Sequence, residues 1–436
     1  MARADSPVSN AWTRWQRVLF RFLFVYLLLY TSPWFLRLLG VNSVSRNYFR
    51  LVDWAVRASN ARLFHVRETL IPTNGSGDTS WAWAELWLFL SVAAIGCAIW
   101  SALDRNRRSY PLLGYWLRTF TRYYLATYAL SYGISKLFWL QMPFPTLSQM
   151  STPLGDFLPM RFSWMFMGFS APYQFFAGFM ETAAGLLLLN RRTVTFGLFA
   201  ATGTFINVVM INLSYDVPVK LFASHLLFAS VFLLLFDTRR LVAFLVLNQP
   251  APPTAAYEPP FTRPWQHWTA LAAKAVVIVL ILILPFESQW NRYKATVNQP
   301  DSVPFRAGVY DVVRYVVNGD TIPSLAADTV RWKDVIFDNA GFASVNTTDP
   351  LFWQRYRRGY FRYKADTATH TAVVWKTSAV PDSTFLFTMR YETPDSGRVR
   401  LWTSVRNDSL YVELVRTPRH FQLAERQFHW LSEYNR

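Results

Sequence analysis

Ionisable side chains stand within or beside long apolar segments of this 436-residue chain. The stretch SYDVPVKLFASH places Asp216, Lys220 and His225 at the start of one apolar run, and two other runs contain Lys136 and Glu181. A charged group inside a bilayer costs a few kcal/mol, so it needs a partner, water or a function. These residue types can hydrogen bond the polar head of an amphiphile or exchange protons with it.

We therefore expect one outward-facing polar cavity in a membrane bundle. The expected catalytic groups, which would supply hydrogen bonds or protons, are Lys136, Glu181 and His225. The expected ligand-binding groups are Asp216, Lys220, Asn207 and Asn212. The histidines and carboxylates do not have the spacing of metal ligands, so no metal site is expected.

The SYDVPVK stretch also has a purely structural interpretation. Pro218 suits the first turn of a helix, and Asp216 just before it can cap the free amides. Lys220 opposes the helix dipole there, and a salt bridge to Asp216 or Glu181 would neutralise the helix entrance. His225 can equally be a core imidazole that bonds a neighbouring helix.

Glu181 has two interpretations as well. It lies in GFMETAAG, where Gly178 and Gly185 share its face of the helix. Small residues on that face let a neighbouring helix or a ligand approach closely. The sequence leaves open whether Glu181 is functional or belongs to a buried pair.

Seven apolar segments must position these groups. Each contains a window of about 18 to 25 residues with few charges, enough for a helix to cross a bilayer core of about 30 Å, and the third is the longest and is expected to project from the bilayer. The first lacks a small-residue cleavage site, so we expect it to stay as an anchor. The fold class predicted for this part is an α-helical membrane bundle of about seven transmembrane helices, at residues 18–39, 82–103, 112–140, 172–189, 194–213, 219–236 and 268–286.

Composition excludes several other classes. Hydrophobic residues make up 52% of the chain and charged residues 16%, which is too apolar for an ordinary soluble enzyme. Residues 1–286 carry 24 Lys and Arg against 11 Asp and Glu, whereas residues 287–436 carry 20 against 16. The net charge of +17 therefore belongs mainly to the membrane part, where topology and anionic lipid explain it better than nucleic acid does. Cys97, the single cysteine, is expected to be a small buried hydrophobe.

Arginines predict the orientation of the chain. They cluster before the first segment and in alternate connections, at Arg14, Arg17, Arg105, Arg107, Arg108, Arg191, Arg192, Arg239 and Arg240. By the positive-inside rule, the N-terminus is cytoplasmic and everything after residue 286 lies outside. We expect a multi-pass protein of a cell inner membrane with the bilayer as its first partner.

The first outer connection predicts an amphipathic helix. Arg46, Arg50, Asp53 and Arg57 share one side of SVSRNYFRLVDWAVRASNARLF, and apolar residues share the other. This helix can lie along the membrane surface with Trp54 as an interfacial anchor, or it can pack on the bundle. The sequence does not decide between the two.

The last third of the chain has a different period. After a Pro-rich linker and the seventh apolar segment, hydrophobic residues alternate with polar ones and short turns such as NGD and PDSG separate the runs. We expect an antiparallel all-β extracytoplasmic domain, as a sheet, sandwich or small barrel. Its histidines His370, His420 and His429 are scattered, and YRRGYFRYK reads as a half-exposed strand or as a ligand-gripping segment.

At this point a family resemblance emerges. GISKL, a Pro- and Gly-rich loop and ETAAGLLLLNRR resemble the DoxX-like membrane proteins over about residues 112–240. Lys136 and Glu181 match the family lysine and glutamate, Gly185 its packing glycine, and Arg191 and Arg192 its basic cap. The resemblance implies a four-helix core and, as for some members, transfer of electrons from sulfur compounds to quinone. The absence of paired cysteines argues against thiol chemistry here.

The predicted domains are residues 1–110, an N-terminal transmembrane pair with an outer amphipathic loop; 111–246, the DoxX-like core; 247–267, a cytoplasmic Pro-rich linker; 268–286, the seventh helix; and 300–436, the β domain.

Three functions are compatible with these features of the sequence. The bundle can bind quinone or another amphiphile in a redox-linked role, with an electron-donor protein as partner because no cofactor signature is evident. It can be a noncatalytic scaffold that presents the β domain to envelope proteins, or a proton-linked transporter.

Overall fold

The computed structural model describes residues 12–72, 77–251, 259, 262–298, 304–325, 328, 330–376 and 385–426. The chain divides into two compact units. The helical unit comprises Met1–Met142 and Ser170–Tyr293, and the barrel unit comprises Pro143–Phe169 and Lys294–Arg436. Residues 252–258 and 260–261 of the predicted linker, and His429, lie outside the described residues.

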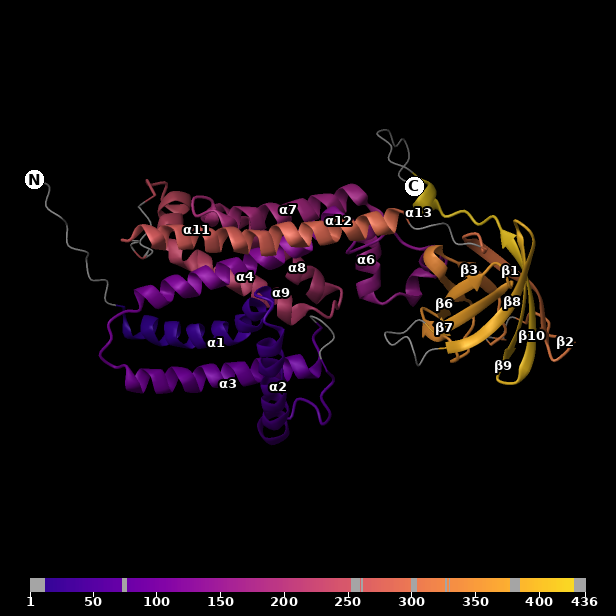
Figure 1. Cartoon of the computed structure of the whole chain (residues 1–436), viewed down its shortest axis with the longest axis horizontal. Coiled ribbons are helices and arrows are strands. Elements are labelled where there is room, and N and C mark those ends of the chain that lie inside the picture. The colour runs from indigo at the N-terminus through magenta and orange to yellow at the C-terminus, as the bar shows by residue number, and fades with distance from the viewer. Residues whose placement is uncertain are drawn as a thin grey trace, which may run out of the picture. The chain divides into compact units, whose positions relative to one another are not determined.

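Each of the seven predicted apolar segments is helical (Figure 1). The helices are α1 (Arg14–Leu38), α3 (Ser80–Leu103), α4 (Pro111–Leu137), α7 (Ala171–Leu189), α8 (Val194–Ser214), α9 (Lys220–Leu234) with its extensions η3 (Leu235–Asp237), α10 (Thr238–Leu241) and η4 (Val242–Val246), and the run α11 (Pro264–Ile278), η5 (Val279–Ile283) and α12 (Leu284–Val297).

Among the described residues, five helices are long and apolar enough to cross a membrane: α1, α3, α8, Lys220–Val246 and Pro264–Val297. The chain is therefore a membrane protein. The other two predicted spans, α4 and α7, fall outside this set. In α4, Arg118, Arg122 and Lys136 lower the mean hydropathy.

Local sequence explains where these helices begin. Thr13 and Gln16 form a capping box at the start of α1, and the Thr79 hydroxyl accepts from the amide of Ala82 in α3. Pro111 opens α4, where its missing N–H would lack a partner in any case. The Ser170 hydroxyl caps α7.

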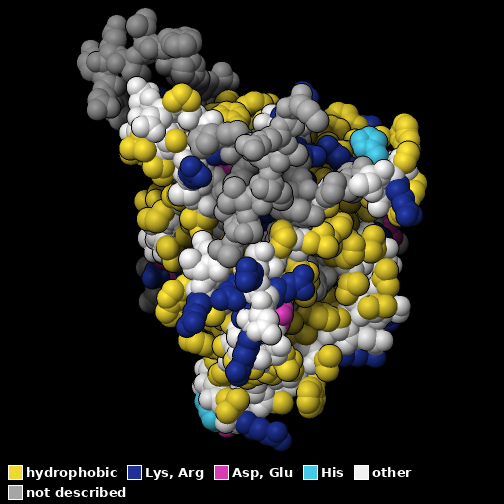
Figure 2. Space-filling view, turned by 90° about the vertical axis from the view of Figure 1, so that its left-hand side faces the viewer, with side chains coloured by type: hydrophobic (Ala, Val, Ile, Leu, Met, Phe, Trp, Pro, Cys, Tyr) yellow, Lys and Arg dark blue, Asp and Glu magenta, His cyan; other side chains and the backbone are white. Residues whose placement is uncertain are grey.

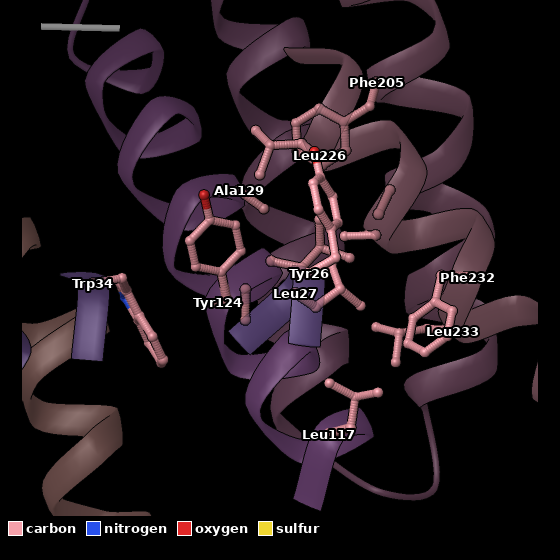
Figure 3. Close-up of a cluster of buried hydrophobic side chains, with 14 of the residues drawn as sticks. Tyr26, Leu27, Trp34, Leu117, Tyr124, Ala129, Phe205, Leu226, Phe232 and Leu233 are labelled. Carbon is pink, nitrogen blue, oxygen red and sulfur yellow. The ribbon is translucent and has the colours of Figure 1, made fainter. Parts of the chain in front are cut away.

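Aliphatic and aromatic side chains from α1, α4, α8 and α9 fill the core of the helical unit. Figure 3 shows part of this cluster, including Tyr26, Leu27, Trp34, Leu117, Tyr124, Ala129, Phe205, Leu226, Phe232 and Leu233. Cys97 of α3 is buried, and its thiol lies 3.3 Å from the Val18 carbonyl oxygen. Its environment agrees with the expectation of a small buried hydrophobe.

The arginines of the first two clusters meet at one end of the helical unit. A guanidinium nitrogen of Arg17 donates to the carbonyl of Arg107 at 2.9 Å, and the amide of Trp12 donates to the carbonyl of Arg108. Figure 2 views the end of this unit where α1 begins, and Lys and Arg side chains gather on that face among hydrophobic ones. Grouping of cationic residues at one end of the bundle is what the positive-inside pattern requires.

Helix α2 (Asn42–Ser59) follows α1 and continues into η1 (Asn60–Phe64). In Figure 1 it runs across the direction of α1 and α3 rather than along it. Ser45, Val52 and Val56 are buried against the bundle, whereas Leu51 and Trp54 are exposed. The helix thus packs on the bundle and also keeps a second apolar surface uncovered.

The barrel unit contains an antiparallel β structure, as predicted, and it closes on itself. Its strands are β1 (Gly308–Val317), β2 (Asp320–Thr321), β3 (Asp334–Phe337), β4 (Phe342–Val345), β5 (Trp353–Arg355), β6 (Arg358–Asp366), β7 (Thr371–Lys376), β8 (Phe385–Asp395), β9 (Arg398–Val405) and β10 (Asp408–Thr417). In the described chain, eight strands follow the order β10-β9-β8-β7-β6-β4-β3-β1, and β1 pairs with β10 to close the barrel. Strands β2 and β5 are short and pair antiparallel with β1 and β6, respectively.

Aromatic side chains fill the barrel interior. Phe305 stacks on Phe337 with ring centroids 4.6 Å apart, and Tyr363 and Tyr391 pack edge-on against Phe305. Phe352 closes another part of the core against Trp332, Phe361 and Phe387. This interior is a packed core of the kind that small eight-stranded barrels have.

Residues 143–169 belong to the barrel unit although they connect α4 to α7. They form α5 (Leu147–Met150), η2 (Leu154–Asp156) and α6 (Pro159–Phe169). Ser148 is buried, and its hydroxyl donates to Asp338 and bonds Ser344 at 2.7 Å. Asp156 pairs with Arg357 at 3.0 Å. The sequence predicted this segment only as a loop between two helices of the core.

Candidate functional site

Lys136 and Glu181 form a buried ion pair between α4 and α7. The Lys136 ammonium donates to both carboxylate oxygens of Glu181, at 2.6 and 2.5 Å. Their side chains are 7% and 3% exposed. Each charge therefore has its counter-charge within the protein, as a charge removed from water requires.

Close helix packing makes this pair geometrically feasible. A Cβ added at Gly178 would lie 2.8 Å from the Lys136 Cβ and from the Gly133 carbonyl oxygen, so only glycine fits there. At the end of the same helix pair, the Gln174 amide donates to the Met142 carbonyl at 2.7 Å. The GFMETAAG pattern is thus explained by close helix approach, one of the two interpretations that the sequence allowed.

The SYDVPVK stretch forms a second group at the start of α9. Lys220 donates to Asp216 at 2.7 Å, which is one of the salt bridges expected from the sequence. The helix cap comes from elsewhere, because Asp78 accepts from the backbone amides of Lys220 and Leu221 at 2.7 and 2.9 Å. The expectation that Asp216 caps α9 is therefore wrong. Its side chain is 83% exposed and it precedes the helix by four residues in a left-handed conformation.

His225 centres a third group. Its Nδ1 lies 2.6 Å from the Leu221 carbonyl oxygen, and its Nε2 lies 2.5 Å from the Tyr26 hydroxyl. Because a carbonyl oxygen only accepts, Nδ1 carries the proton in the neutral ring and Nε2 accepts from Tyr26. The imidazole also stacks on Tyr30, with centroids 4.0 Å apart. This is the expected imidazole bonded to a neighbouring helix, with an aromatic ring against its face.

Glu85 of α3 joins the third group. It is half-buried and lies close enough to interact electrostatically with the hydroxyls of Tyr26, Tyr30 and Tyr48. Within the described part of the chain, its carboxylate makes no hydrogen bond or ion pair. We name Tyr26, Tyr30, Glu85 and His225 the His225 cluster.

A row of tyrosines on α4 links the ion pair to the His225 cluster. Tyr124, Tyr128 and Tyr132 precede Lys136 at intervals of four residues, so they share one face of the helix. The ring of Tyr132 lies 5.9 Å from the Lys136 ammonium. Successive rings of the row are 4.9 and 6.5 Å apart, and the ring of Tyr124 packs edge-on against that of Tyr30 with centroids 6.2 Å apart. Aromatic and hydroxyl groups therefore run continuously between the two sites.

The predicted site residues thus fall into three groups. Among the described residues, no hydrogen bond or ion pair joins Lys136 and Glu181, Asp216 and Lys220, and His225 to one another across those groups. Asn212 is buried and donates to the Val219 carbonyl, so it supports the loop before α9. Asn207 is exposed on α8. The structure does not bring Asn207 to any of the three groups.

Sequence reasoning missed several members of these sites. The tyrosines at intervals of four before Lys136 were visible as one helical face and give the clearest signal that was overlooked. Glu85 was also visible as a carboxylate within an apolar segment. Asp78 gave no such signal, because it lies 142 residues from the helix that it caps. The described residues include no group of three or more His, Cys, Asp or Glu that could hold a metal ion.

Comparisons with known proteins give little further guidance. No family model matches the chain. It is similar to the uncharacterized protein YwoB of Bacillus subtilis (strain 168), with 35% identity over 78 residues, which are 18% of this chain and 51% of that protein. The chain thus spans about half the length of this curated relative. No solved structure matches.

Proposed function

We propose that this membrane protein is DoxX-like and binds the polar head of a quinone-class amphiphile at the His225 cluster, in a redox-linked role. The observation that carries the proposal is the arrangement of His225 between the Tyr26 hydroxyl and the stacked ring of Tyr30. The cluster lies on helices apolar enough for a bilayer, where a lipid-soluble ligand would approach. The N-terminus is cytoplasmic and the barrel lies on the outer side, in keeping with the positive-inside pattern.

The residues of the cluster fit a quinone head group chemically. Such a head is a flat ring with two carbonyl acceptors, and the cluster offers aromatic faces for stacking and tyrosine hydroxyls as donors. Glu85 and His225 are the groups that could exchange protons with it. A bound quinone would supply two-electron redox chemistry, and a partner protein would supply the electrons.

Lys136 and Glu181 take a different role in this proposal. Their charges are satisfied by each other, so they hold α4 against α7 instead of contacting the ligand. Asp216 and Lys220 hold the loop before α9 in the same way. Of the residues that the sequence analysis assigned to one cavity, the proposed binding site therefore keeps only His225.

Equilibrium dialysis with a short-chain ubiquinone and a short-chain menaquinone tests the proposal on the detergent-purified chain. His225→Phe keeps an aromatic ring against Tyr30 but removes the imidazole that orients the Tyr26 hydroxyl and would bond the ligand. Loss of one hydrogen bond to the ligand costs about 1–1.5 kcal/mol. We expect quinone affinity to fall about 10-fold. His267→Phe is the matched control, because His267 is an exposed imidazole of α11 that packs on Trp268 and not on the His225 cluster, and it should leave affinity unchanged. Equal affinity in wild type and His225→Phe would refute the proposal.

The barrel surface favours a second candidate, a noncatalytic scaffold for envelope proteins. Trp402 and Tyr411 pack side by side on neighbouring strands, with Arg390 over one ring and Arg314 over the other. Aromatic and arginine side chains are enriched in the energetic centres of protein interfaces. Cross-linking that captures the same envelope protein with wild type and with Phe385→Ala, but loses it with Trp402→Ala, would support this function. Unchanged capture by Trp402→Ala would exclude this patch.

A further inference from the structure

Helix α2 has the orientation of a helix that lies on a membrane surface. Three residues separate its start from the end of α1, and it runs across the direction of α1 and α3 (Figure 1). Because α1 and α3 are both long and apolar enough to span a bilayer, a helix that crosses them at their ends lies along the plane of that bilayer. This conclusion does not depend on the side of the membrane or on the quinone proposal.

The exposed surface of α2 has an apolar side and a cationic side, and both run along the length of the helix. At about 100° per residue, Val44 and Leu51 lie within about 20° of each other on one flank, to one side of the stripe formed by the buried residues Val52 and Val56. Their exposed fractions are 49% and 62%. Arg46, Arg50 and Arg57 lie on the opposite flank and are exposed.

Trp54 stands between the two flanks and is 67% exposed. An apolar flank, an indole at the boundary and cationic groups on the other flank match the order of acyl chains, interface and head groups in a bilayer. Packing on the bundle explains only the buried stripe, because it leaves Leu51 and Trp54 uncovered. A membrane surface accounts for all three parts of the helix.

Arg46 and Arg50 are one helical turn apart and lack a protein partner in the described part of the chain. Asp53, the acidic residue on this face, is already held by Arg57 at 2.9 Å and by the indole N–H of Trp81 at 2.7 Å. Arg46 and Arg50 therefore present two guanidinium groups to whatever covers the helix. Arginine recognises phosphate through paired hydrogen bonds.

These two arginines also need an explanation other than topology. They lie beyond the C-terminal end of α1, whereas the arginines near Arg17 and Arg107 meet at its N-terminal end. The positive-inside rule uses an excess of basic residues at one end only. Basic residues at the other end point to a local anionic partner.

We propose that α2 is an in-plane interfacial helix whose Arg46 and Arg50 bind the phosphate of anionic phospholipids. Val44, Leu51 and Trp54 enter the boundary between head groups and acyl chains. The ligand class is a phosphodiester with a net negative charge, such as phosphatidylglycerol, and not a zwitterionic lipid. The site is separate from the His225 cluster, so failure of one proposal leaves the other standing.

Native mass spectrometry of the full chain in an equimolar mixture of phosphatidylglycerol and phosphatidylcholine tests the lipid preference. Each arginine near an anionic surface contributes about a factor of five, so Arg46→Gln with Arg50→Gln should lower the preference for phosphatidylglycerol about 25-fold. Arg46→Lys with Arg50→Lys keeps the charges and should retain most of it. Arg362→Gln with Arg419→Gln, exposed arginines of the barrel unit, is the matched control and should change nothing. An unchanged preference in the first double variant would overturn the proposal.

A depth measurement covers the case in which the glutamine variant fails to fold. Cys97→Ala removes the native thiol, and Leu51→Cys or Arg50→Cys then carries a nitroxide in lipid nanodiscs. We expect oxygen to relax the label at position 51 more than a polar nickel reagent does, and the reverse at position 50. Preferential relaxation of both labels by the nickel reagent would show that α2 faces water, which contradicts an interfacial position.

Discussion

The buried ion pair of Lys136 and Glu181 should behave as a unit in a thermodynamic cycle. Both side chains are less than a tenth exposed and both carboxylate oxygens are bonded, so the pair lies in the regime of buried charges. Removing one partner of such a pair costs about 3–5 kcal/mol because the other charge stays buried without compensation. Replacing both partners by apolar residues of similar volume is often neutral or stabilising.

We therefore expect Lys136→Met and Glu181→Leu each to lower the free energy of unfolding by about 3–5 kcal/mol, which reduces the folded-to-unfolded ratio about 150- to 5,000-fold. The double variant should lie within about 1 kcal/mol of wild type or above it. Titration of the detergent-purified chain with sodium dodecyl sulfate, followed by helical circular dichroism, reports on the helical unit. The barrel unit contributes little to that signal because it is mostly strands.

Two results would refute this reasoning. If each single variant lowers the free energy of unfolding by less than about 1 kcal/mol, the pair behaves like an exposed salt bridge, which contributes little to stability. A double variant that loses the sum of both single losses would show that the two charges are not coupled.

Two further predictions address packing and pH. Gly178→Ala should destabilise the helical unit by about 1–3 kcal/mol in the same titration, since its Cβ would overlap Lys136, whereas Gly203→Ala meets open space and should cost less than about 0.5 kcal/mol; equal losses would contradict the packing argument. Burial raises the pKa of Asp338, so its contribution to barrel stability is fully present below its unfolded pKa of about 3.9 and is lost as pH rises through the folded pKa. Asp338→Asn should remove this component from the pH profile of barrel unfolding followed by near-UV circular dichroism, and an unchanged profile would contradict it.

The sequence predicted the elements better than their connections. Long apolar runs determine a helix wherever they occur, so all seven segments were found. Period-two alternation predicted antiparallel strands in the same way. The sequence did not distinguish a barrel from an open sheet or a sandwich. A barrel closes through pairing of β1 with β10, for example Val309 with Thr417, and no local pattern encodes that contact.

The candidate site shows the same limit. Residue type and depth identified Lys136, Glu181 and His225 as groups that need partners, but the partners came from other helices. Proximity in sequence favoured Asp216 as the cap of α9, and tertiary structure supplied Asp78 instead. The predicted site residues were expected to line one cavity. They form three separate groups instead, because Lys136 pairs with Glu181, Lys220 with Asp216, and His225 with Tyr26.

The assignment of residues 143–169 to the barrel unit affects how the two units can be separated. The chain passes between the units at three places, after Met142, after Phe169 and after Tyr293. One protease cut before Lys294 would leave the barrel held by Ser148 and its neighbours, so release of the barrel from the helices by a single cleavage is disfavoured. For the same reason, the C-terminal segment from Lys294 onward does not contain the whole barrel unit and cannot be moved to another protein as a complete domain. Grafted onto another membrane anchor from Lys294 onward, it would expose Asp338 and Ser344 where the native protein buries them.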